Sequence, residues 1–352
     1  MDLAIVGAAG SCGRQLAVQL LDERVLLPSA RLQLVGHHGG PSEGELWGLR
    51  ADLKDAFVDD APYVELVTEP EQIDADIVVM LAGGTVPTDP NLPFDRAALG
   101  RENYRLFAAY ADALARQSGP PPVVIVQSNP VELGVQVFAD RLGRHRVLGA
   151  AAWSDTLRFR GEIAAELGVG RRQVHAYVLG QHGLHLVPVW SQIHVKGVDA
   201  ASVDTLVARI RSERFMPDFP AELRAEVEHL LELVRTSNAQ SAYDFVQSLP
   251  ADLRMAVKPY FIHYTSGRTT EVTTAHAVAD LVTHLIKGEH RVFPAQIALE
   301  GEWLDIHGVV AAPTLLGLEG WDAVYPLELA EDEAEALAVA VAAVDEILQA
   351  CA

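Results

Sequence analysis

Short apolar runs alternate with helical patterns along the first 148 residues. Runs of four or five apolar residues that stop at a glycine or a polar turn are typical of buried parallel strands. Between them, apolar positions recur every three or four residues, as in helices that bury one face. The predicted strands are 3–6, 31–35, 64–67, 77–81, 123–126 and 146–148, and the predicted helices are 14–21, 43–56, 96–117 and 130–142. This alternation predicts a Rossmann-type doubly wound parallel sheet of the α/β class.

The pattern changes after residue 148, where longer helices and antiparallel strands are expected. The predicted strands are 174–179, 186–195, 292–299 and 309–312, and the predicted helices are 155–167, 202–215, 221–246, 275–287 and 331–350. This part is an α+β unit, and no low-complexity linker separates it from the first. We therefore expect a dinucleotide-binding domain at 1–148 and a substrate-binding, catalytic domain at 149–352, packed as one unit.

The charge balance excludes two classes of partner. A formal net charge of −21 argues against nucleic acid or an anionic membrane surface, because either would need a basic face. A small anionic substrate is still allowed, since local arginines decide its binding. The two cysteines, Cys12 and Cys351, make no disulfide framework. Residues 1–7 begin a strand directly, with no charged leader or long apolar run, so we expect a cytoplasmic protein.

A glycine-rich turn follows the first predicted strand. Gly7, Gly10 and Gly13 are spaced three apart, with Ser11 and Cys12 between the last two. Glycine permits a tight turn and lets backbone amides approach a pyrophosphate at the positive end of a helix. The spacing alone is weak, but a strand before it and a helix after it favour a dinucleotide site made by these five residues.

The tip of the second predicted strand is where such domains select NAD or NADP. An acidic residue there would bind the ribose hydroxyls of NAD and repel the extra phosphate of NADP. This chain has Gly36 and His37 in a segment, 34–40, that holds no acid. The segment is either a polar loop without cofactor contact or a site relaxed for the 2′-phosphate. We lean slightly toward NADP and count Gly36 and His37 as cofactor-binding.

Several motifs, in order, carry a resemblance to a known family. They are Gly7-Ala-Ala-Gly-Ser-Cys-Gly13, Ser128-Asn-Pro130, Asp155-Thr-Leu-Arg-Phe-Arg160, Gly180-Gln-His-Gly183 and Ala279-Asp-Leu281. With them the chain resembles the lactate/malate dehydrogenase family over nearly its whole length. The resemblance implies hydride transfer between a nicotinamide cofactor and a 2-oxo or 2-hydroxy acid.

The chemistry of such a reaction suits His182, Asp155 and Arg158. Reduction of a ketone leaves an alkoxide that must receive a proton, and imidazole titrates near working pH. Asp155 would hold the other ring nitrogen, and Arg158 could bind the substrate carboxylate through its planar fork. Taken alone, Asp155 and Arg158 would be an ordinary ion pair on a helix that Ser154 caps. Asn129, at the end of a strand, could bind the reacting oxygen or the nicotinamide.

Three further residues follow from the resemblance. The family carries an arginine on a loop that closes over the substrate, seven residues before an asparagine that contacts the cofactor. Arg96 and Asn103 have that spacing, which implies that Arg96 polarises the substrate carbonyl. The alternative for Arg96 is a solvated arginine at the start of a helix. Thr270 matches a position that lines the substrate pocket.

The chain departs from the family where the substrate tail would lie. Segment 85–95 has neither the second arginine of malate dehydrogenases nor the glutamine common in lactate dehydrogenases. Leu184 stands where many relatives have aspartate, and residues 248–267 look like an insertion. We expect a malate dehydrogenase-like enzyme in which a basic residue of the insertion replaces the missing arginine. The alternatives are a dehydrogenase for another 2-oxo acid and a non-catalytic relative.

The family resemblance also suggests how the chain assembles. Helix 43–56 carries an apolar stripe, which suits a contact between two copies of the chain. We expect a homodimer.

Overall fold

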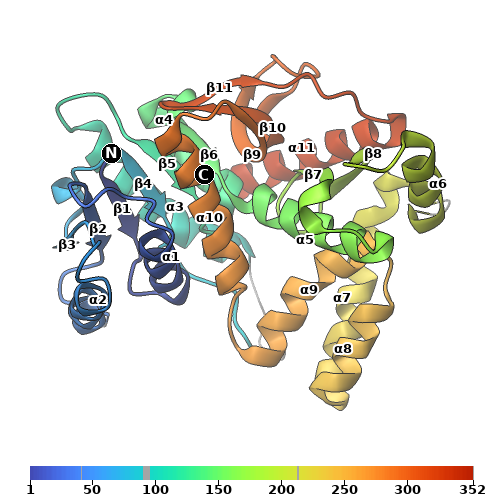
Figure 1. The fold of residues 1–352 in the computed structure, drawn as a ribbon, viewed down its shortest axis with the longest axis horizontal. Coiled ribbons are helices and arrows are strands. Elements are labelled where there is room, and N and C mark those ends of the chain that lie inside the picture. Colours follow the sequence, from blue (N-terminus) through green and yellow to red (C-terminus); the bar gives the residue numbers. More distant parts are fainter. Residues whose placement is uncertain (41, 90–95, 212–213, 352) are drawn as a thin grey trace.

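The computed structural model describes all residues of the chain except 41, 90–95, 212–213 and 352, and of Arg96 and Ala97 it describes the backbone alone. The first half contributes six parallel strands to a mixed sheet in the order β3-β2-β1-β4-β5-β6 (Figure 1). These are β1 (Leu3–Val6), β2 (Arg31–Val35), β3 (Tyr63–Val67), β4 (Ile77–Met80), β5 (Val123–Val126) and β6 (Val147–Gly149). This is the strand order of a doubly wound nucleotide-binding sheet, so the predicted Rossmann topology is confirmed.

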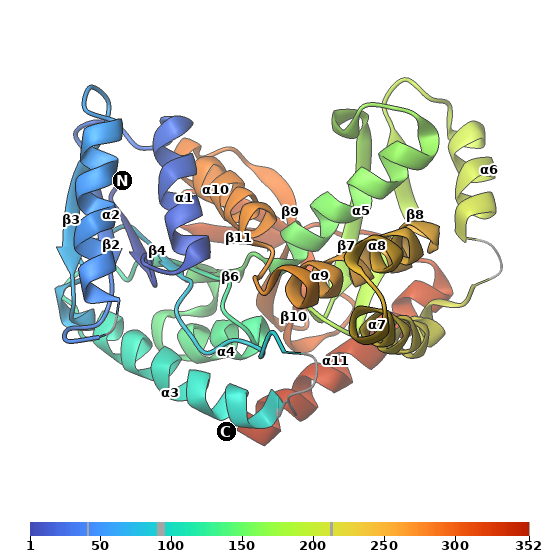
Figure 2. The same ribbon diagram turned by 90° about the horizontal axis from the view of Figure 1, so that it is seen from below.

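Helices cover both faces of these parallel strands. The helices of this half are α1 (Ser11–Asp22), α2 (Glu43–Ala56), α3 (Arg96–Ala115) and α4 (Val131–Leu142). Leu3 and Ile5 of β1 pack in one apolar cluster with α1 and α2, whereas Ala4 and Val6 pack in another with α3 and α4. Successive side chains of a strand point to opposite faces, so a fully apolar strand requires a helix layer on each side. The two layers are visible in Figure 2.

The second half extends the same sheet with antiparallel strands. Its strands are β7 (Val174–Gly180), β8 (Leu186–Val195), β9 (Arg291–Glu300), β10 (His307–Gly317) and β11 (Gly320–Val324). β6 pairs with β9 through Gly149 and Gln296, and the order continues β9-β10-β7-β8. The chain thus forms one continuous sheet across its two halves.

Seven helices among the described residues complete this half. They are α5 (Ala151–Leu167), α6 (Ala200–Arg211), α7 (Phe219–Thr236), α8 (Ala239–Ser248), α9 (Ala251–Ser266), α10 (Glu271–Lys287) and α11 (Glu331–Cys351). Short 3-10 helices occupy Pro70–Gln72, Arg144–Arg146, Arg171–Gln173 and Met216–Asp218. Helix α10 packs beside α1 and helix α11 beside α3, so each helix layer of the first half gains a helix from the second. Within the described residues, no helix is long and apolar enough to cross a membrane.

Several predicted helices have other bounds in the structure, among them 155–167 and 221–246. Helix α5 begins at Ala151, directly after β6, so Ser154 lies inside the helix instead of capping it. The predicted helix 221–246 is two helices, because Asn238 caps the start of α8 by accepting a hydrogen bond from the Ser241 amide. The expected excursion at 248–267 is almost entirely the helix α9. Helices α7, α8 and α9 together project from the lower side of the molecule in Figure 1.

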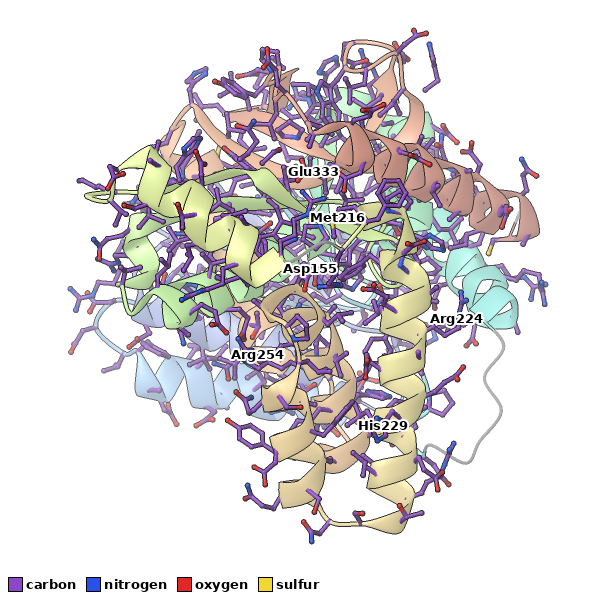
Figure 3. The ribbon with its side chains drawn as sticks, turned by 90° about the vertical axis from the view of Figure 1, so that its right-hand side faces the viewer. Asp155, Met216, Arg224, His229, Arg254 and Glu333 are labelled. Atoms are coloured by element: carbon purple, nitrogen blue, oxygen red, sulfur yellow. The ribbon has the colours of Figure 1, made fainter. Side chains whose placement is uncertain are left out.

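Glu333 joins helix α11 to strand β8. Its side chain is fully buried and accepts hydrogen bonds from the amides of Trp190 (2.8 Å), Ser191 (2.9 Å) and Ala330 (3.1 Å). The Ser191 hydroxyl donates to it as well, at 2.5 Å. The carboxylate lies in the first turn of α11, where the helix dipole favours a negative charge. Figure 3 shows Glu333 between these elements. One carboxylate therefore accepts from four donors, of which the Trp190 amide is buried.

Removing this carboxylate should destabilise the protein without touching its chemistry. Glu333→Ala leaves these donors without their acceptor, and we expect the free energy of unfolding to fall by roughly 3 kcal/mol. The exposed Glu335, on the same helix, gives the matched control Glu335→Ala. Urea unfolding followed by circular dichroism measures both. Equal stability of the two variants would contradict the assignment.

Candidate active site

The Asp155 carboxylate lies between two cationic side chains. Its Oδ2 accepts a hydrogen bond from His182 Nδ1 at 2.7 Å, and its Oδ1 accepts one from Arg158 Nη1 at 2.8 Å. The Asp155 side chain is 4% exposed, whereas that of His182 is 23% exposed. Because Nδ1 is bound to Asp155, Nε2 is the ring nitrogen left to exchange a proton with a substrate.

Two elements from distant parts of the sequence bring this group together. On α5, Asp155 and Arg158 stand three residues apart and so share one face of the helix. Strand β7 ends at Gly180, whose φ of +81° turns the chain toward His182. A side chain at Gly180 would come within 2.6 Å of the His185 carbonyl oxygen, so only glycine fits this turn. The sequence prediction placed the same three residues in contact.

The charges around His182 favour its protonated form. Burial acts to lower the pKa of His182, but the carboxylates of Asp155 and Glu132 raise it by more, so the pKa lies above its ordinary value. Burial likewise acts to raise the pKa of Asp155, but His182 and Arg158 hold it below its ordinary value. Asp155 is therefore held in its ionised form, and the shift of the His182 pKa favours the protonated imidazole.

Glu132 is a residue of this site that the sequence analysis missed. It is buried in the first turn of α4, and its Oε1 accepts a hydrogen bond from the His182 amide at 2.7 Å. Burial raises the pKa of Glu132. The signal in the sequence was an acidic residue in the otherwise apolar start of a helix, directly after Asn129 and Pro130.

Thr270 links the second half to Arg158. Arg158 Nη2 donates to Thr270 Oγ1 at 2.9 Å, so two of its five N–H donors hold the guanidinium within the protein. The remaining donors are the ones that a carboxylate could use. The neighbouring Thr269 hydroxyl lies 3.5 Å from Cys12 Sγ, on the glycine-rich turn. The predicted cofactor turn and the predicted substrate residues therefore adjoin each other.

Asn103 joins two backbone segments beside the site. Its side chain is buried, and its Nδ2 donates to the carbonyls of Asn129 (2.6 Å) and Gly84 (3.2 Å). Its Oδ1 accepts from the Gly84 amide at 2.8 Å. These three hydrogen bonds fix the two segments to each other, and the contact of Asn103 with the cofactor stays a prediction. Asn129 itself is exposed, just beyond the carboxyl end of β5.

The glycine-rich turn is built for a pyrophosphate. Gly7 has a φ of +86°, and a side chain at Gly13 would come within 2.5 Å of the Gly7 carbonyl oxygen. Gly10 and Ser11, at the start of α1, are exposed, and Cys12 is partly exposed. The first amides of a helix have no partner within it and point outward as donors to an anion. These residues fit the phosphates of a dinucleotide.

The loop after β2 contains a carboxylate, although segment 34–40 has none. Glu43, in the first turn of α2, folds back so that its Oε2 accepts from the Gly39 amide at 2.8 Å. Its Oε1 lies 3.8 Å from His38 Nδ1. His37 is exposed, and Gly36 donates its amide to the Val67 carbonyl at 2.9 Å.

Arg96 is the first residue of α3, but its side chain lies outside the described residues. Its predicted role in catalysis therefore stays a prediction from its place in the sequence.

Comparison with known proteins places the chain in a family. The family model for the lactate/malate dehydrogenase NAD-binding domain matches residues 1–149, and that for the family's α/β C-terminal domain matches residues 154–262. The chain belongs to the lactate/malate dehydrogenase family. It is an NAD-dependent 2-hydroxy acid dehydrogenase, as this membership implies.

Relatives of this dehydrogenase carry both family names. It is 27% identical to an L-lactate dehydrogenase of Gloeobacter violaceus, over 95% of this chain and 88% of that one. It is 26% identical to a malate dehydrogenase of Methanothermobacter thermautotrophicus, over 96% and 92%. The solved structure of an Aeropyrum pernix malate dehydrogenase has the same fold, with a TM-score of 0.75 at 22% identity over 99% and 97% of the two chains. These similarities do not distinguish between substrates.

The electrostatic link between Asp155 and His182 can be tested apart from activity. In Asp155→Asn the pKa of His182 should fall below its wild-type value, because the largest influence that raises it is lost. NMR titration of the His182 ring measures this. Asp280→Asn is the matched control, since Asp280 raises the pKa of His284 in the same way. A His182 pKa that shifts equally in both variants would contradict the link.

Proposed function

We propose that the dehydrogenase reduces a 2-oxo acid to its 2-hydroxy acid, with His182 as proton donor and Asp155 as the group that orients it. The observation that carries this is the 2.7 Å contact of His182 with a buried carboxylate, which leaves Nε2 to the substrate. The bound nicotinamide supplies the hydride. In the reverse direction His182 takes the proton back.

The substrate carboxylate is assigned to Arg158. Its guanidinium is held by Asp155 and Thr270, which fixes its plane and lowers the entropy lost on binding a ligand. Asn129 is assigned to the reacting oxygen or the nicotinamide, because it follows the carboxyl end of a strand, where ligands of such sheets bind. Arg96 is assigned to the carbonyl oxygen by its position at the start of α3.

The proton-transfer role predicts a large loss in one variant. His182→Ala should lower kcat/KM for every accepted 2-oxo acid by roughly 100- to 10,000-fold, since a positioned general acid contributes about that much. The exposed His175 on β7 gives the control His175→Ala, which should keep its activity. The oxidation of NADH, followed by its absorbance, measures both. Near-full activity of His182→Ala would refute the assignment.

The cofactor is NAD. How strongly the enzyme prefers NAD to NADP depends on the residues that follow β2. The sequence leans toward NADP because residues 34–40 hold no acid. We infer the opposite preference from Glu43, whose carboxylate is bound to the Gly39 amide and would repel a 2′-phosphate.

Neutralising Glu43 should therefore relax the choice of cofactor. In Glu43→Gln the ratio of kcat/KM for NADH to that for NADPH should fall by about tenfold, because the repulsion of the 2′-phosphate is lost. Glu45→Gln removes the other charge in the first turn of α2 and serves as the control. A wild-type preference for NADPH would contradict the inference.

The finer choice of substrate depends on residues 248–267. A malate dehydrogenase-like enzyme needs a second cation for the distal carboxylate, which the sequence suggests could come from this segment. Arg254 and Lys258 are instead paired with glutamates of α5, and Arg268 is exposed beside Glu271. This favours the alternative, a dehydrogenase for another 2-oxo acid.

The homodimer and the cytoplasmic location stay predictions. The three buried residues of α2, Leu46, Leu49 and Leu53, face its own half of the molecule, so its apolar stripe is used within the chain. Trp47, on the other side of the helix, is 57% exposed and is the residue available to a second copy.

A further inference from the structure

Helix α9 runs antiparallel to α5 and leads toward Arg158. Near its start, Arg254 pairs with Glu162 and Glu166, each at 2.5 Å. One turn later, Lys258 pairs with Glu162. Just after the helix, Thr270 contacts Arg158, one turn earlier on α5. The residues between Lys258 and Thr270 therefore lie near the Arg158 end of the site. Figure 3 labels Arg254 on α9 and Asp155 on α5.

The other side of α9 contacts the segment that leads into α3. His263 Nε2 donates to the Pro87 carbonyl at 3.0 Å. Helix α9 therefore borders the space between α5, which carries Arg158, and the segment at Pro87.

Helix geometry identifies which side chains face this space. Successive residues of an α-helix are about 100° apart. Lys258 faces α5, and Ile262 lies four residues later, about 40° further around the helix. His263 faces Pro87, and Pro259 lies four residues earlier, about 40° back toward Lys258. Both are partly exposed. The opposite side of the helix carries Tyr260 and Phe261, which pack against the apolar cluster of α7 and α8.

Among the described residues of this segment, each of the three cations has a carboxylate partner, and Arg268, the one nearest in sequence to Thr270, lies 3.6 Å from Glu271. Both cations of α9 are engaged with α5, and residues 259–264 read Pro-Tyr-Phe-Ile-His-Tyr, without a formal charge. Segment 85–95 contains no lysine or arginine. Leu184, two residues after His182, packs against the same apolar cluster. A second carboxylate placed here would lose its hydration without gaining a partner.

We propose that the substrate is a monoanionic 2-oxo acid with an uncharged, branched or aromatic side chain, and that this side chain packs against Pro259 and Ile262. This proposal rests on the function proposed above. Arg158 binds the single carboxylate, and Ile262 selects the tail. Packing removes the apolar surface of the tail from water, and this stabilises the complex in proportion to the area that is buried.

The test compares 2-oxo acids in the wild type and in two variants. With NADH, kcat/KM for 4-methyl-2-oxopentanoate or phenylpyruvate should exceed that for oxaloacetate by roughly 100-fold. Ile262→Ala should lower the value for the branched acid by about tenfold and leave pyruvate nearly unchanged. Ile262→Arg supplies the missing cation, and should raise the value for oxaloacetate by about tenfold while lowering it for the branched acid.

Gln240→Arg is the matched control, because it adds the same charge at an exposed position of α8 and should change none of these ratios. A wild type that prefers oxaloacetate would overturn this inference alone. So would an Ile262→Ala variant that loses activity equally toward all acids. If the wild type reduces none of the acids with either cofactor, the proposed function falls as well.

Discussion

The structure of the site depends on one buried carboxylate with a cation on each side. Asp155 would be costly to bury alone, and Arg158 would be costly to bury without it. Glu132, whose carboxylate accepts from the His182 amide, adds a second acidic group beside the imidazole. The buried contact of Asp155 thus raises the pKa of His182 and holds the Arg158 guanidinium in place.

The cationic side chains of Arg158 and His182 lie in a protein with a formal net charge of −21. Much of the surrounding basic charge is neutralised in place, as Arg254 and Lys258 are by Glu162 and Glu166. These ion pairs hold α9 against α5, and they also remove two cations that an anionic tail could otherwise use. The same ion pairs therefore stabilise the packing of α9 and disfavour a substrate with a second carboxylate.

Much of this arrangement was readable from the sequence, and the exceptions have physical causes. Apolar runs alternating with helical periodicity predicted the Rossmann sheet, because each strand is buried on both faces. The spacing of Asp155 and Arg158 predicted that they share a helix face, and the family motifs that hold Asp155 and His182 implied the contact between these two. Contacts of residues outside these motifs were not readable. Glu132 accepts from an amide 50 positions away.

Two other residues show the same limit. The spacing of Asn103 from Arg96 suggests a cofactor ligand, but it does not reveal that the side chain bonds the backbone of Gly84 and Asn129. Ser154 has the chemistry of a helix cap, but β6 ends so close to α5 that the helix begins at Ala151, four residues earlier than predicted. The ion pairs of α9 could not be anticipated, because nothing local to Arg254 indicates that it meets α5.

The pairing of β6 with β9 has a consequence for how the chain can be divided. The first 149 residues have a nucleotide-binding topology, yet α10 covers one of their helix layers and α11 the other. A fragment ending at residue 149 would expose the edge of β6 together with the apolar surfaces beneath both helices. Such an edge recruits strands from other molecules. The first 149 residues are therefore continuous in sequence but depend on the second half for their folding. We expect truncation or gene fusion at residue 149 to give a product that aggregates.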